Sequence, residues 1–137
     1  MPAQITLDID YDFDFSLVAI SCFEWEYRLA WLINKKLGSN LVRDEDLEVR
    51  FKSDQSYHAL YTGACNDGEC KLALIKNREA DGIMMPELVQ IDYMLKIEDA
   101  YSNAEDYVKK LREITQIQGA YLIDVEKLRY KEYLITE

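Results

Sequence analysis

Four aspartates at alternate positions near the N-terminus form the densest group of potential cation ligands in the sequence. They are Asp8, Asp10, Asp12 and Asp14. Calcium-binding loops have oxygen ligands at a similar spacing, but they turn around the ion and contain a glycine. Here isoleucine, tyrosine and phenylalanine intervene and favour a strand, in which carboxylates on one face lie roughly 6.5–7 Å apart. We therefore predict a solvated strand face, or a mobile acidic arm over residues 1–12; an acidic strip facing a partner and a metal site are the alternatives.

Two aromatic residues beside an arginine give the clearest indication of a binding surface. Residues 22–37 are predicted to form an amphipathic helix, whose apolar stripe packs on the core. Tyr27, Arg28 and Trp31 lie on the opposite, polar face of that helix. Aromatic residues and arginine are enriched in interface hot spots. We therefore predict that these three residues contact a protein partner or a second copy of the chain; burial of the two aromatics beneath a loop or a chain end is the alternative.

The segment 85–93 combines a proline, two carboxylates and a tyrosine. Glu87 and Asp92 are five positions apart, so in one strand they would point to opposite faces and would not form the convergent pair that acid–base catalysis needs. Pro86 fixes φ and lacks an N–H, which suits the entry of a strand. We predict a structural turn into a strand, with Glu87 or Asp92 bound to backbone N–H groups or to an arginine. The alternative is a small-molecule or divalent-metal site made by Glu87, Asp92, Tyr93 and the aspartate row.

The sequence contains three cysteines and one histidine that could take part in catalysis, metal binding or redox chemistry. Cys65 and Cys70 flank the turn sequence Asn-Asp-Gly, and across a hairpin they would be close enough for a disulfide. Because the N-terminus lacks the pattern of a secretory leader, we expect a reducing cytoplasm and three free thiols. Cys22 falls at a predicted helix start, which lowers a thiol pKa. His58 is the single histidine and is predicted on a strand surface, without a hydrolase motif around it.

The charge of the chain disfavours two classes of partner. Its 26 acidic residues against 16 lysines and arginines give a net charge of −10, and no basic stripe is present to bind a phosphate backbone. Anionic membranes are disfavoured for the same reason, and no run approaches the ~20 apolar residues that span a bilayer. The sequence also lacks the common nucleotide-binding and hydrolase motifs. We therefore predict a non-enzymatic protein-interaction module without a cofactor, whose partner is another protein or a second copy in a homodimer, and neither nucleic acid nor a membrane.

Two helices and about six strands must position these residues. Alternating or continuous apolar residues predict strands at 5–20, 47–51, 57–62, 70–76, 91–97 and 118–124. Capping boxes at Ser21 and Ser102 predict helices over 22–37 and 103–115, the first of which ends at Gly38. Short links between the middle strands favour antiparallel pairing. The prediction is one α+β domain over residues 1–137, with both amphipathic helices on one face of a mostly antiparallel sheet; a ferredoxin-like wiring with an extra hairpin is one arrangement that fits.

The segment from Met85 to Tyr93 resembles the signature of the IPExxxVDY family of bacterial proteins, with Met85 and Ile91 as conservative departures. Other segments are similar to the same family, in the same order along the chain. They are the acidic–aromatic strand that leads into 17–21, then 27–30, 34–35, 121–124 and 127–128. The resemblance covers nearly the whole chain. It implies a small cytoplasmic bacterial protein and supplies no catalytic residues.

Overall fold

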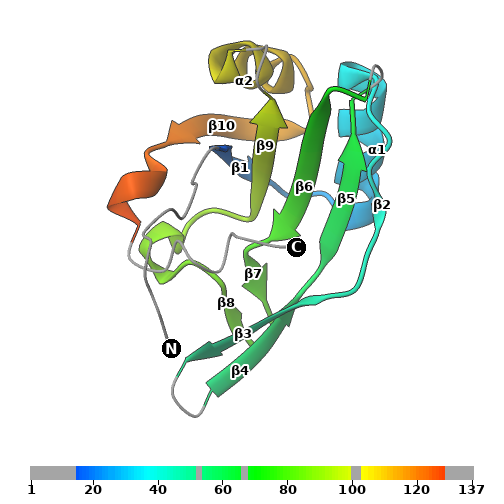
Figure 1. Ribbon diagram of the computed structural model, residues 1–137. Coiled ribbons are helices and arrows are strands. Elements are labelled where there is room, and N and C mark those ends of the chain that lie inside the picture. Colours follow the sequence, from blue (N-terminus) through cyan, green and yellow to red (C-terminus); the bar gives the residue numbers. More distant parts are fainter. Residues whose placement is uncertain (1–14, 52–53, 66–67, 100–102, 129–137) are drawn as a thin grey trace.

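A six-stranded antiparallel sheet forms the centre of the molecule (Figure 1). The computed structural model describes residues 15–51, 54–65, 68–99 and 103–128 of the chain. Neighbouring strands lie in the order β10-β1-β9-β6-β5-β2, and each adjacent pair is antiparallel. The strands are β1 (Ser16–Cys22), β2 (Val42–Arg43), β5 (Leu60–Ala64), β6 (Cys70–Lys76), β9 (Tyr93–Asp99) and β10 (Ile117–Ile123). Together with the two α-helices of the described ranges, this sheet confirms the predicted α+β class.

The two helices lie between strands that are not neighbours in the sheet. α1 (Glu26–Leu37) follows β1 on the way to β6, and α2 (Ala104–Arg112) connects β9 to β10. In the sheet, β9 lies between β1 and β6, while β1 lies between β9 and β10. In the sheet one strand therefore separates β1 from β6 and one separates β9 from β10, as in the split β-α-β wiring of a ferredoxin-like sheet. In the chain, β2 and β5 are inserted between α1 and β6. β5 and β2 extend that arrangement beyond β6.

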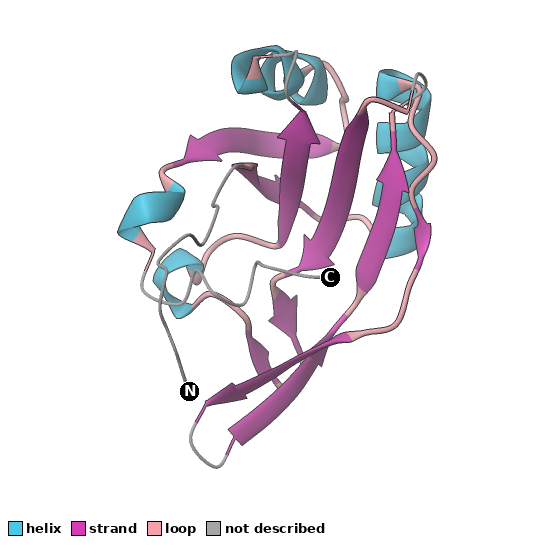
Figure 2. Cartoon of the chain, viewed as in Figure 1, coloured by secondary structure: helices cyan, strands magenta, loops and turns pink. Residues whose placement is uncertain are grey.

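Both α-helices lie against the same face of the sheet (Figure 2). Their buried residues share one hydrophobic cluster with alternate residues of β1, β6 and β9. The helical members are Leu29, Ala30, Ile33, Tyr107, Val108 and Leu111, and the strand members include Val18, Ile20, Leu72, Leu74, Leu95 and Ile97. Burial of each large apolar side chain contributes roughly 1.5–3 kcal/mol, so this cluster holds both helices on the sheet. Neither helix is long and apolar enough to cross a bilayer, nor is any other in the described ranges.

The opposite face of the sheet is covered by strands and short turns. β3 (Leu47–Phe51) pairs with β4 (Asp54–His58) in a separate two-stranded sheet, and β7 (Arg78–Glu79) pairs with β8 (Gly82–Ile83) in another. The 3-10 helices η2 (Pro86–Leu88) and η3 (Val125–Lys127) complete this layer. Buried residues of this face form a second cluster that includes Val49, Ile75, Met84, Met85 and Met94. Met85, the first residue of the segment predicted as a structural turn, is therefore part of the core.

The strand predicted at 57–62 is interrupted at Ala59, so that boundary was wrong. The N–H of Ala59 donates to the Glu79 carboxylate at 3.0 Å, and its carbonyl accepts from the N–H of Lys76 at 3.0 Å. These hydrogen bonds satisfy the backbone N–H and carbonyl of Ala59, where the chain passes from β4 in the two-stranded sheet to β5 in the six-stranded sheet. The sequence has no local sign of this break, because both partners lie more than fifteen residues away.

The predicted start of the first helix was also wrong. Ser21 does not cap it but lies in β1, where it pairs with Gly119 of β10. Pairing with β10 extends the strand to residue 22, and α1 begins only at Glu26. Gly38 ends α1 as predicted, with a φ of 70° in the left-handed region that glycine tolerates. The second helix is capped by Asn103, whose side chain accepts from the N–H at position 105.

Cys65 and Cys70 form a disulfide across the end of the β5–β6 hairpin. Their Cα atoms are 5.4 Å apart, within the range that a disulfide bridges. The expectation of three free thiols was therefore wrong for this pair, whereas Cys22 is free and buried. Disulfides are rare in reducing compartments, so the redox state of this pair in cells tests the predicted location.

Reduction of the disulfide should lower the free energy of unfolding by about 2 kcal/mol. The bond closes a short loop, with a sequence separation of 5, and removes chain entropy from the unfolded state. Urea unfolding with and without a phosphine reductant measures the difference. A double variant, Cys65→Ser with Cys70→Ser, is the control and should not respond to the reductant. An unchanged unfolding midpoint of the wild-type protein would contradict the prediction.

Lys96 places an ammonium group in the interior of the sheet. Its side chain is 5% exposed, with Nζ 3.7 Å from the Glu98 carboxylate and 4.8 Å from the centre of the Phe15 ring. Burial lowers the pKa of Lys96 from its ordinary value of 10.5. The folded state therefore binds this proton less tightly than the unfolded state does. The contribution of Lys96 to the free energy of unfolding should rise with pH between the lowered pKa and 10.5.

Replacing Lys96 with methionine should raise the free energy of unfolding at pH 7 by about 1 kcal/mol, because the buried charge is removed while most of the side-chain volume is kept. The gain over wild type should shrink at pH 10, where wild-type Lys96 loses its proton more readily. Urea unfolding at both pH values tests this. Lys71→Met, at an exposed position of β6, is the control and should change stability by less than about 0.5 kcal/mol.

Candidate functional site

Asn77, a buried residue between β6 and β7, holds the segment 85–93 in place. Its side-chain carbonyl accepts from the N–H of Met85 at 2.8 Å, and its amide donates to the carbonyls of Leu88 and Ile91, each at 2.9 Å. The backbone N–H of Asn77 also donates to the carbonyl at position 92. These bonds satisfy the backbone groups of a turn that is packed against the core. Asn77 therefore sets the position at which β9 begins.

Asp92 and Tyr93, at the start of β9, hold the backbone that joins β1 to α1. The Asp92 carboxylate accepts from the N–H of Cys22 at 3.0 Å. The Tyr93 hydroxyl donates to the carbonyl of Glu24 at 2.6 Å. Burial raises the pKa of Tyr93, so the phenol keeps the proton that it donates. The structural interpretation of the motif is confirmed for Asp92, whose carboxylate binds a backbone N–H.

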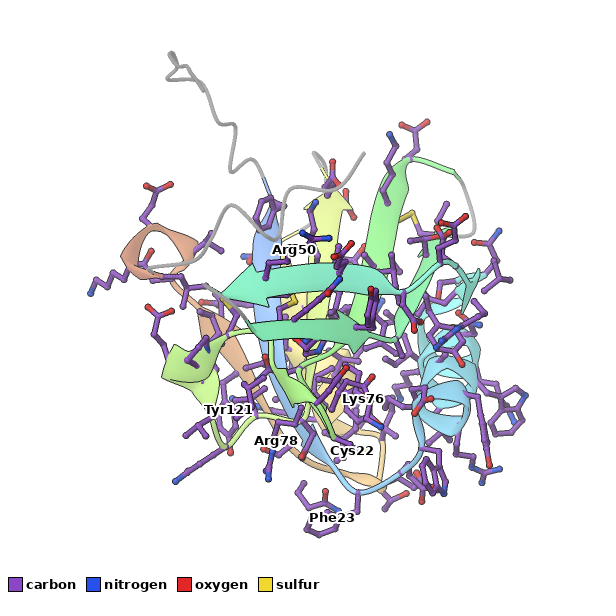
Figure 3. The ribbon with its side chains drawn as sticks, turned by 90° about the horizontal axis from the view of Figure 1, so that it is seen from below. Cys22, Phe23, Arg50, Lys76, Arg78 and Tyr121 are labelled. Atoms are coloured by element: carbon purple, nitrogen blue, oxygen red, sulfur yellow. A yellow bond between two sulfur atoms is a disulfide. The ribbon has the colours of Figure 1, made fainter. Side chains whose placement is uncertain are left out.

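A cavity of about 230 Å³ opens beside this β1–α1 junction, defined as residues 22–25. Its walls include Cys22, Trp25, Lys76, Arg78 and Tyr93. Of these, Cys22, Lys76 and Arg78 are labelled in Figure 3. The Arg78 guanidinium lies 3.8 Å from the Asp92 carboxylate. The Lys76 ammonium lies 3.5 Å from the Glu26 carboxylate and 3.6 Å from that of Glu79. Since carboxylates of the chain already accompany both cations, the cavity carries no excess positive charge for an anionic ligand.

Cys22 lies in the wall of this cavity with a neutral thiol. Its Sγ donates to the carbonyl of Gln116 at 3.3 Å, and burial raises its pKa. The sequence predicted the reverse, a pKa lowered at a helix start. That prediction was wrong because Cys22 ends β1, and α1 begins only at Glu26. A neutral thiol is a weak nucleophile, so Cys22 is not prepared for covalent catalysis.

His58 and Ser56 have the spacing of a catalytic dyad but are sealed inside the protein. Ser56 Oγ lies 2.7 Å from His58 Nε2, and His58 Nδ1 lies 2.8 Å from the carbonyl of Lys76. Because a carbonyl only accepts, Nδ1 carries the proton and Nε2 accepts the Ser56 hydroxyl. Ser56 and His58 are 4% and 0% exposed, so a substrate has no access to the hydroxyl. The predicted surface position of His58 was wrong, because its ring is hydrogen-bonded to the backbone of β6.

Four aromatic side chains project from the β1–α1 junction and from the outer side of α1; we call them the aromatic surface. They are Phe23 (88% exposed), Trp25 (66%), Tyr27 (58%) and Trp31 (48%). Figure 3 shows Phe23 pointing away from the body of the protein. Lys76 Nζ lies 5.6 Å from the centre of the Trp25 ring, and Lys35 Nζ lies 4.5 Å from that of Trp31. Tyr27 and Trp31, like Arg28, face outward; no loop of the described chain buries them.

The other predicted site residues do not converge on one place. Pro86 begins η2 rather than a strand, which suits a residue without an N–H. Glu87 is exposed on η2 and does not line the cavity at Asp92 and Tyr93. The aspartate row at positions 8–14 lies outside the described residues. Within the described ranges, no group of three or more His, Cys, Asp or Glu residues could hold a metal ion. The alternative of a metal site therefore has no assembled ligand set in those ranges.

Comparison with known proteins gives no indication of function, so the function is inferred from the geometry of the site. No family profile, curated protein or solved structure matches the chain. The resemblance to the IPExxxVDY family therefore stays a prediction.

Sequence reasoning missed three residues that shape the site. Phe23 and Trp25 were placed in a helix, although three aromatic residues within the five positions 23–27 were a visible signal. Asn77 directly follows the strand predicted at 70–76 and lies outside every predicted helix and strand. Its burial depends on the turn that packs over it, which no local pattern reveals.

Proposed function

We propose that this protein is a non-catalytic interaction module that binds another protein through its aromatic surface. The observation that carries the proposal is the exposure of Phe23, Trp25, Tyr27 and Trp31, all within nine residues of the chain. Exposed apolar residues scattered singly are ordinary, whereas a contiguous group marks an interaction site. Tryptophan and tyrosine are also the side chains most enriched in interface hot spots.

The size of the aromatic surface agrees with this function. At roughly 150–250 Å² for each aromatic side chain, the four exposed fractions leave on the order of 500 Å² of aromatic area in water. A standard interface buries about 800 Å² on each partner. The aromatic surface would therefore supply more than half of such an interface, with the polar rim coming from neighbouring residues.

The contacts beneath the surface support a binding role rather than a catalytic one. The side chains of Asp92 and Tyr93 form hydrogen bonds with the backbone of the β1–α1 junction. These two hydrogen bonds hold Phe23 and Trp25 at fixed positions. A rigid support lowers the entropy that is lost when a partner binds. The motif segment then acts as a scaffold for the surface.

Replacing the aromatic surface should abolish partner binding while the fold is kept. The variant carries serine at positions 23, 25, 27 and 31. Its control carries serine at four exposed apolar positions elsewhere, namely Val42, Tyr57, Val89 and Tyr121. Light scattering over a range of concentrations measures self-association, and quantitative capture from an extract of the source cells measures binding of other proteins. We expect at least about a tenfold loss for the surface variant alone; equal behaviour of both variants would refute the proposal.

We also propose a cytoplasmic location, which the resemblance to the IPExxxVDY family implies. In that compartment glutathione keeps cysteine pairs reduced. Acid quenching of intact cells, followed by alkylation of the denatured protein, should therefore label Cys65 and Cys70 as well as Cys22. A protected pair would place the chain in an oxidising compartment.

A further inference from the structure

A groove of about 320 Å³ runs beside Trp31, between α1 and the turn that follows α2. Trp31, Leu32 and Ile114 give it an apolar side. Lys35 and Lys36 line it as well. The groove is therefore amphipathic, and it continues the aromatic surface toward the C-terminal end of α1.

The charges around the groove are positive on balance. The guanidinium carbon of Arg28 lies 5.0 Å from the centre of the Trp31 ring, and Lys35 Nζ lies 4.5 Å from it. Neither Arg28 nor Lys35 forms an ion pair with a carboxylate of the described ranges. The one carboxylate in the groove, that of Glu113, is bound to Lys36 at 2.6 Å. Within the part of the chain that the structure describes, these two positive charges thus have no carboxylate partner, although the net charge of the chain is −10.

We propose that this groove binds an acidic segment of the partner protein, with an apolar side chain of that segment packed against Trp31. The inference rests on the proposed function and names the chemistry of the partner. Asp or Glu side chains of the segment would reach Arg28 and Lys35, while a Leu or Phe side chain would contact Trp31, Leu32 and Ile114. Charged groups at the rim of an interface speed association and set its specificity, and buried aromatic anchors supply most of the affinity.

The acidity of the rest of the chain does not oppose this assignment. At physiological ionic strength, charges separated by more than about 8 Å are largely screened. The partner segment therefore responds mainly to Arg28 and Lys35 and to the Lys36–Glu113 pair, which is neutral as a unit. The pKa of Glu113 is lowered by the hydrogen bond and charge of Lys36, which favours the ionised carboxylate.

A binding assay with a defined peptide tests the inference. The probe is a fluorescein-labelled peptide of about twelve residues that alternates Asp or Glu with Leu and Phe, and its counterpart has Lys in place of each acid. Fluorescence anisotropy with the full chain gives the affinity. We expect binding of the acidic probe and at least about a tenfold weaker affinity for the basic one. Affinity for the acidic probe should also fall as sodium chloride is raised from about 50 to 500 mM.

Charge reversal at the groove gives the matched comparison. Arg28→Glu with Lys35→Glu should weaken binding of the acidic probe at least about tenfold, and Trp31→Ala should do so to a similar degree. Lys71→Glu with Lys127→Glu changes the net charge by the same amount at exposed positions that do not line the groove and should leave the affinity within about twofold. Circular dichroism spectra that match the wild type verify that each variant is folded.

The outcomes separate this inference from the proposed function. No binding of the acidic probe at about 1 mM, or equal losses in the two charge-reversed variants, would overturn the acidic-segment assignment. The proposed function would still stand if the four-serine surface variant lost its protein partner in the capture experiment. If that variant kept its partner while the acidic probe bound the groove, the proposal that the aromatic surface binds the partner would be refuted.

Discussion

Replacing Asn77 with alanine should lower the free energy of unfolding by about 4 kcal/mol. The change removes three side-chain hydrogen bonds, which join Asn77 to Met85, Leu88 and Ile91. It leaves one backbone N–H and two carbonyls without these partners in a region packed on the core, at a cost of about 1–3 kcal/mol for each. Because a domain of this size is stable by only about 5–15 kcal/mol, urea unfolding should show a transition at much lower denaturant.

Asn40 offers the matched control for this variant. Its side chain also accepts from a backbone N–H, that of Ala64 at 2.7 Å, but the residue is exposed. Water can replace the lost partner there, so Asn40→Ala should cost no more than about 1 kcal/mol. If the Asn77 and Asn40 variants lost equal stability, Asn77 would not be the residue that holds the motif segment.

Replacing Asp92 with alanine should cost about 2–3 kcal/mol and should also weaken partner binding. The carboxylate is the acceptor for the N–H of Cys22 at 3.0 Å, and a hydrogen bond to a charged group contributes about 1.5–3 kcal/mol. Without it the β1–α1 junction is held mainly by Tyr93, and Phe23 and Trp25 lose their fixed positions. Urea unfolding measures the first effect, and capture of the partner well below the melting temperature measures the second.

Two further variants separate the hydrogen bond of Asp92 from its ion pair. Asp92→Asn keeps an oxygen that can accept from Cys22 and should recover about half of the lost stability. Arg78→Gln removes only the guanidinium, which is half-exposed and 3.8 Å from the carboxylate, and should cost less than about 0.5 kcal/mol. A larger loss for Arg78→Gln than for Asp92→Ala would show that the ion pair, not the backbone hydrogen bond, supports the junction.

The role of the motif segment was only partly visible in the sequence. Glu87 and Asp92 were expected not to converge, and they do not, but the reason differs from the expected alternation of a strand. Glu87 lies in η2 and Asp92 precedes β9, so the two do not share a strand. The sequence predicted that Asp92 could bind a backbone N–H, but it did not predict which residue supplies that N–H. Cys22 lies 70 residues away along the chain, and only the pairing of β1 with β9 brings the two together.

The largest error of the sequence-based prediction concerns the β1–α1 junction, and it has one cause. Ser21 and Glu24 have the spacing of a capping box, which favours a helix from position 22. In the folded chain, however, Ser21 pairs with Gly119 and extends β1. Tertiary pairing overrode a local preference worth about 1 kcal/mol. As a result Phe23 and Trp25 lie in an extended turn and project into solvent.

The sequence by itself determined the α+β class, the single apolar face of each helix and the outward position of Tyr27, Arg28 and Trp31. Each of these follows from a periodicity of a few residues, which one stretch of chain displays completely. Only the tertiary structure decided that Asn77 is buried, that Ser56 and His58 are sealed beneath the surface, and that Phe23 and Trp25 project into solvent ahead of α1. Those features depend on hydrogen bonds and strand pairings between residues far apart in the chain, and no local pattern contains them.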